Sequence, residues 1–221
     1  MVATHILVRS ISETHRGLAA ELDTAIETRF DPGEPRKGFE YADTFLATAS
    51  RHLNAVENVV VPAVQKHVED SAPLVHEYVE ASKDLEAALA RAKAREYHSY
   101  YAVTQPWTEV WHEVRDTLDH QRGLELELAG RLCAALDDTD LDDLSDELHR
   151  AELVAPSRPH PHAPHLGLPG RMARRVLHTV DSFWDAAEGR MVPETVHKEH
   201  KSPGRMGQYL LADPRFDEDE S

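Results

Sequence analysis

Apolar residues recur at helical spacing in four long segments, and this pattern constrains the fold more than any other feature of the sequence. The segments cover about residues 10–30, 37–69, 72–97 and 106–136. The only β-branched run, VVVP at 59–62, lies inside one of these helical patterns, so strand signals are nearly absent. Short connections between long amphipathic helices favour antiparallel neighbours. The sequence therefore predicts an all-α fold, an up-down antiparallel four-helix bundle.

The character of the chain changes after the fourth segment, which suggests three parts. Residues 1–136 are predicted to form the bundle. Residues 137–190 contain an acidic helix, a Pro/His-rich connector (APSRPHPHAPHLGLPG) and a fifth amphipathic helix that we expect to pack on the bundle. Residues 191–221 are polar, and we expect a partly mobile tail.

Charge and composition exclude several classes of function. Lys and Arg together number 24 against 40 Asp and Glu, a formal charge of −16 that argues against nucleic-acid binding. No apolar run approaches the roughly 20 residues that span a bilayer, so no membrane association is expected. The first residues lack the apolar core of a signal peptide, and the single Cys133 excludes an internal disulfide framework. We therefore expect a cytoplasmic protein.

Histidine is unusually frequent, with 15 residues, and its distribution suggests a site. Each helical segment carries one histidine well inside it: His15, His52, His76 and His120. A single histidine on an apolar face is more often a hydrogen-bonded core residue than a ligand. Four of them, one per helix, favour convergence on one point in the bundle core, where such folds place metals. Imidazole nitrogens suit iron, zinc and copper.

Four short motifs carry a resemblance to a known family. They are ETHRGLAAEL, HLNAVENVVVP, VHEYVEASKDLEAAL and DHQRGLELELAGRL. In their order and spacing the chain resembles the hemerythrin-like, or HHE cation-binding, family over about residues 8–135. The resemblance implies a four-helix bundle that holds a non-haem di-iron centre bridged by carboxylates. It also implies that the protein handles oxygen, peroxide or nitric oxide.

The chain departs from the family pattern at the carboxylate ligands. The family's glutamate follows the ligand histidine by four residues, but these positions are Val56 and Leu124 here, and the acids lie one residue further along. Four residues rotate a side chain by about 40° around a helix, whereas five rotate it by about 140°. The acids are therefore not expected to reach a metal held by the histidine of their own helix, unless a π-bulge re-phases the helix.

These considerations predict a histidine-rich, carboxylate-poor core site. The expected metal ligands are His15, His52, His76 and His120, and the secondary candidates are Glu80, Glu57 and Glu125. Non-haem iron is the expected cofactor, with haem or another transition metal as the alternative. The expected partners are a metal ion and a small diatomic or peroxide ligand. The rival hypothesis is a metal-free or haem-binding four-helix bundle that serves as a structural or regulatory interaction module.

Overall fold

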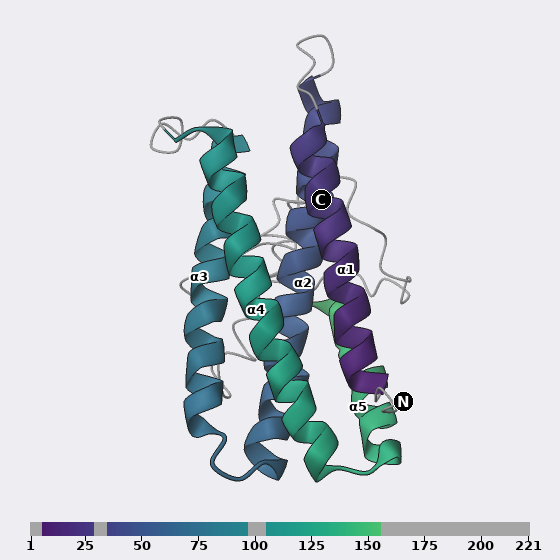
Figure 1. Cartoon of the computed structure of the whole chain (residues 1–221). Helices are drawn as coiled ribbons and strands as arrows, with labels where there is room; N and C mark the ends of the chain where they lie inside the picture. Colours follow the sequence, from purple (N-terminus) through teal and green to yellow (C-terminus); the bar gives the residue numbers. More distant parts are fainter. Residues whose placement is uncertain (1–5, 29–34, 97–104, 156–221) are drawn as a thin grey trace, which may run out of the picture.

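The computed structural model describes residues 6–28, 35–96 and 105–155 (Figure 1). All regular structure in these ranges is helical: α1 (Ile6–Glu27), α2 (Pro35–His67), α3 (Ala72–Glu96), α4 (Trp107–Ala135) and α5 (Asp138–Val154). The first four helices match the predicted segments to within a few residues, and the acidic segment forms α5. The connector, the expected helix after it and the tail lie outside the described residues. Among the described helices, none has the length and apolar character needed to cross a membrane.

Local signals in the sequence explain where the helices begin and end. Pro106 precedes α4 in an extended conformation, with φ −60° and ψ 146°. Asp137 caps α5, because its side chain accepts a hydrogen bond from the backbone N–H of Asp140 at 3.0 Å. Acidic residues in the first turn of α5 also face the positive end of the helix dipole. Pro62 lies on an exposed side of α2, and the helix continues through it.

Helix α2 lies in the middle of the molecule, where it contacts all four other helices. Figure 1 shows α3 and α4 to one side of it and α1 to the other, with α5 beside the lower end of α1. Residues 52–57 are consequently all buried, although they go more than once around the helix. Val56, one of the two positions at which the sequence resemblance implied a glutamate, is a core residue with no exposed surface. A residue on this part of α2 is therefore buried whichever direction it faces.

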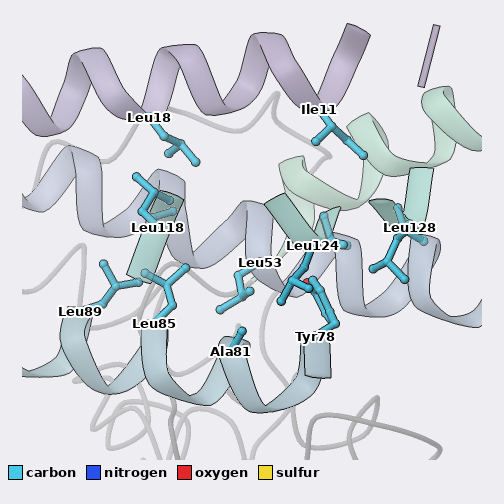
Figure 2. Packing of buried hydrophobic residues seen from close by; sticks show 14 of the residues in the cluster. Ile11, Leu18, Leu53, Tyr78, Ala81, Leu85, Leu89, Leu118, Leu124 and Leu128 are labelled. Carbon is cyan, nitrogen blue, oxygen red and sulfur yellow. The ribbon is translucent and has the colours of Figure 1, made fainter. Parts of the chain in front are cut away.

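The register of α3 and α4 is set by polar contacts as well as by apolar packing. Gln121 Nε2 donates to Ser82 Oγ at 3.1 Å, and Arg91 forms an ion pair with Glu113. The contacts move backward along α4, from residue 121 to residue 113, as they move forward along α3, from 82 to 91. The two helices are therefore antiparallel. Figure 2 shows apolar side chains filling the interior between the helices, among them Leu85 of α3 and Leu118 of α4. This packing supplies most of the stability of such a fold.

Helix α5 packs against α1 and α2 and closes one side of the molecule. Leu141 and Leu148, seven residues apart and so on one face, are both buried. This docking brings the last turns of α5 next to the middle of α2. The polar site described below lies where α1, α2, α4 and α5 meet.

Candidate metal centre

Two histidines from different helices point at one carboxylate oxygen in the interior. His15 Nε2 and His52 Nε2 each lie 2.8 Å from Oε2 of Glu125. The two imidazole rings are perpendicular, with an interplanar angle of 87° and centroids 5.1 Å apart. All three residues are buried, and Glu125 has no exposed surface. The cluster joins α1, α2 and α4 at a single point.

The local sequence explains why each of these side chains faces inward. His15 lies on the buried stripe of α1, four residues after Ile11 and three before Leu18. Glu125 lies on the buried stripe of α4, four residues after Gln121. His52 belongs to the part of α2 that is buried on all sides. The three residues are therefore held by packed helices rather than by loops.

Helix α5 adds a second carboxylate on the other side of the His52 ring. His52 Nδ1 lies 2.6 Å from Oε1 of Glu152. The other oxygen of Glu152 lies 3.6 Å from Nδ1 of the exposed His149. Both nitrogens of His52 thus face carboxylates and act as donors, which fixes the orientation of the ring.

The charges of this cluster are strongly coupled. Burial alone would lower the pKa of His52, but the charges of Glu125 and Glu152 and the hydrogen bonds to them raise it to about 10. Burial alone would raise the pKa of Glu125, but the positive charge of His52 and the hydrogen bonds from His15 and His52 lower it to about 2. Without a metal, the site is a buried ion pair in which His52 carries a proton on each nitrogen.

The same atoms have the composition and spacing of a metal site. One ligand atom from each of His15, His52 and Glu125 lies within 4.8 Å of the others. Two ligand atoms about 2 Å from one ion, at the right angle of octahedral coordination, lie about 2.8 Å apart. The two nitrogen–oxygen distances of 2.8 Å are close to this value. Glu152 stands where a second carboxylate commonly orients a metal-bound imidazole.

The expected convergence of four histidines is corrected by the structure, because His76 and His120 are exposed. On α3, the buried face is formed by Val75, Tyr78, Val79 and Ser82, and His76 lies outside it. His120 lies five residues before the buried Glu125, so the two residues point to nearly opposite sides of α4. Neither imidazole can join the cluster in this arrangement.

The three carboxylates that were secondary ligand candidates lie in different places, and only one of them joins the cluster. Glu125 was not expected to reach a metal held by His120 of the same helix, and the two side chains do point apart. Glu125 instead contacts His15 of α1 and His52 of α2. Glu57 is buried outside the cluster, and its charge acts on the phenol of Tyr78 on α3. Glu80 is exposed and pairs with Lys83.

Glu152 was missed entirely, although it follows the buried Leu148 by four residues and so continues the buried stripe of α5. For Glu125 a signal also existed: it falls on the same helical stripe as Leu118, Gln121, Leu128 and Leu132. The sequence prediction paired each carboxylate with the histidine of its own helix. Glu125 and Glu152 instead contact His15 and His52, which lie on other helices.

Comparison with known proteins adds no further identification. No protein-family model, no curated protein and no solved structure matches the chain. The functional argument therefore depends on the geometry of the site itself.

Proposed function

We propose that this protein is a metal-binding helical bundle with an altered hemerythrin-like architecture and a mononuclear site for non-haem iron or another transition metal. His15, His52 and Glu125 would hold the ion, and Glu152 would orient His52. The observation that supports this proposal most directly is the approach of two imidazole nitrogens to one carboxylate oxygen in a core position. Bundle cores are where helical proteins build such sites.

The ligand set favours one ion over a bridged pair. Two ions need anionic bridges, and Glu125 is the single carboxylate grouped with His15 and His52 among the described residues. Two histidines and one carboxylate with open positions are typical of non-haem Fe(II) sites, and zinc accepts the same ligands. A bound iron would supply an open coordination position for oxygen, peroxide or nitric oxide.

The residues themselves would prepare the site for the ion. The ion would replace the Nε2 protons of His15 and His52, which both point at Oε2 of Glu125. Glu152 would keep its hydrogen bond from Nδ1 of His52 and so maintain the ring's orientation. The surrounding helices exclude water and strengthen these electrostatic interactions.

The alternative is a metal-free module in which the cluster is only structural. The observation in its favour is that both nitrogens of His52 already have carboxylate partners. Haem fits less well, because Oε2 of Glu125 occupies the position between the two Nε2 atoms that would have to bind its iron.

Metal analysis of the whole chain, purified from iron-supplemented cells, separates these functions. We expect about one ion per chain in the wild type, and loss of that ion in His15→Ala, His52→Ala and Glu125→Gln. His76→Ala and His120→Ala are matched controls, because these histidines are exposed, and both should retain the ion. A wild-type chain without stoichiometric metal, or equal occupancy in all variants, would refute the proposal. The visible spectrum distinguishes iron from haem and from colourless zinc.

A further inference from the structure

The proposed metal position is closed to solvent, so an ion needs a route to it. His15, His52 and Glu125 are 3%, 2% and 0% exposed. Glu152 of α5 contacts this cluster and also reaches the surface, with 21% of its side chain exposed. Its Oε1 lies 2.6 Å from Nδ1 of His52, whereas Glu125 contacts Nε2 of the same ring. Glu152 therefore lies between the buried cluster and solvent.

The second oxygen of Glu152 faces an exposed histidine of the same helix. Oε2 of Glu152 lies 3.6 Å from Nδ1 of His149, whose side chain is 72% exposed. This distance is too long for a good hydrogen bond between the two groups. Two ligand atoms about 2.1 Å from a four-coordinate ion, at the tetrahedral angle, lie about 3.4 Å apart. The pair therefore has nearly the spacing of two ligands of one ion.

Imidazoles and carboxylates thus alternate from the interior to the surface. Their order is His15, Glu125, His52, Glu152 and His149, and the successive nitrogen–oxygen distances are 2.8, 2.8, 2.6 and 3.6 Å. Every member is of a residue type that coordinates zinc or iron. Each of the two carboxylates lies between two imidazoles. An ion held by the outer pair would consequently be separated from His52 by a single carboxylate.

The charge and the anchoring of α5 both favour capture of a cation at this pair. The helix carries seven Asp or Glu residues and a single Arg, and such an excess of one charge raises the local concentration of counter-ions. The hydrogen bond from His52 holds the carboxylate of Glu152 in place, so less side-chain entropy is lost when Oε2 binds an ion. A comparable pair on α4, His112 and Asp116, has its atoms 3.5 Å apart, but the Asp116 side chain is 63% exposed.

We propose that His149 and Glu152 form an outer site that captures a divalent transition-metal ion from solvent and passes it to the core. Two protein ligands leave the other coordination positions to water, so the ion is held weakly and is released inward. Helix α5 ends at Val154, two residues after Glu152, and helix ends open more readily than helix interiors. Opening of this last turn uncovers His52 while Glu152 keeps the ion beside it. The transfer step rests on the proposed function, whereas capture at the outer site does not.

Capture is tested by titrating the metal-free whole chain with zinc and following the ring C–H signals of each histidine by NMR. The signals of His149 should shift at a zinc concentration about tenfold lower than those of His112, because the carboxylate of Glu152 is already ordered. Glu152→Gln should abolish this difference. Signals of His149 that stay in place, or that shift only together with those of His112, would overturn the outer site whether or not the core binds zinc.

Transfer is tested by stopped-flow measurement of zinc uptake by the metal-free chain and of zinc release from the loaded chain to a chelator. His149→Ala should slow both processes by the same factor, about tenfold, because a route alters rates and not the bound state. His112→Ala is the matched control and should change neither rate. Unchanged rates in His149→Ala, or a change in the affinity of the core, would overturn the entry route.

The two tests separate this inference from the proposed function. If the core takes up no zinc but His149 still responds before His112, the proposed function and the transfer step are lost and the capture site remains. If the core of His149→Ala loads at the wild-type rate, the proposed function remains and the entry route is lost.

Discussion

At the scale of single residues, Glu125 determines the properties of the site. Its Oε2 is shared by two imidazoles, and its negative charge is one of the two that keep His52 protonated. Removing one member of a buried ion pair leaves the other charge without compensation, which is costly in a medium of low dielectric. The effect of this residue can therefore be measured even without a metal.

We predict that Glu125→Gln destabilises the metal-free chain by about 3 kcal/mol, because the buried His52 loses the more deeply buried of its two countercharges. Urea unfolding followed by circular dichroism measures this difference. The matched control is Glu127→Gln, since Glu127 is exposed two residues away on the same helix and should change stability by less than about 0.5 kcal/mol. Equal effects of the two substitutions would contradict the structural role of Glu125.

At the scale of elements, α5 contributes to the site although it was expected only as an acidic appendage. It docks on α1 and α2 through Leu141 and Leu148, and this docking carries Glu152 to Nδ1 of His52. The helix thus links a packing interface to the orientation of a candidate ligand. A site that depends on α5 should respond to changes in α5.

We predict that Glu152→Gln weakens metal binding by roughly 10–100-fold, because the ring of His52 loses the carboxylate that orients it. Isothermal titration with zinc measures the affinity. Glu147→Gln, at an exposed position of the same helix, should leave the affinity unchanged. The interpretation fails if Glu152→Gln binds zinc as tightly as the control does.

At the scale of the whole molecule, the coupled charges make folding stability depend on pH. Folding raises the pKa of His52 from 6.5 to about 10, so its stabilising contribution is complete below pH 6.5 and is lost as the pH rises towards 10. Folding lowers the pKa of Glu125 from 4.5 to about 2, so that contribution is complete above pH 4.5 and is lost as the pH falls towards 2. Both stabilising contributions are therefore complete between pH 4.5 and pH 6.5.

We therefore predict that the ion pair stabilises the metal-free chain most between pH 4.5 and 6.5. Above this range the free energy of unfolding should fall with a slope of at most about 1.4 kcal/mol per pH unit for one proton. Urea unfolding at a series of pH values measures the slope. His52→Gln isolates the contribution of this residue, since its curve should be flatter above pH 6.5; parallel curves for wild type and variant would exclude His52 as the source.

The sequence by itself determined the helices, because the periodicity, capping and breaking signals that define them act over a few neighbouring residues. It also indicated that His15 and His52 face inward, since apolar residues surround them at helical spacing. Only the tertiary structure decided which groups meet. The rotation of α3 and α4 leaves His76 and His120 exposed, and the central position of α2 gives His52 partners from α4 and α5. Such pairings depend on how whole helices pack against one another, and no local pattern of residues specifies that.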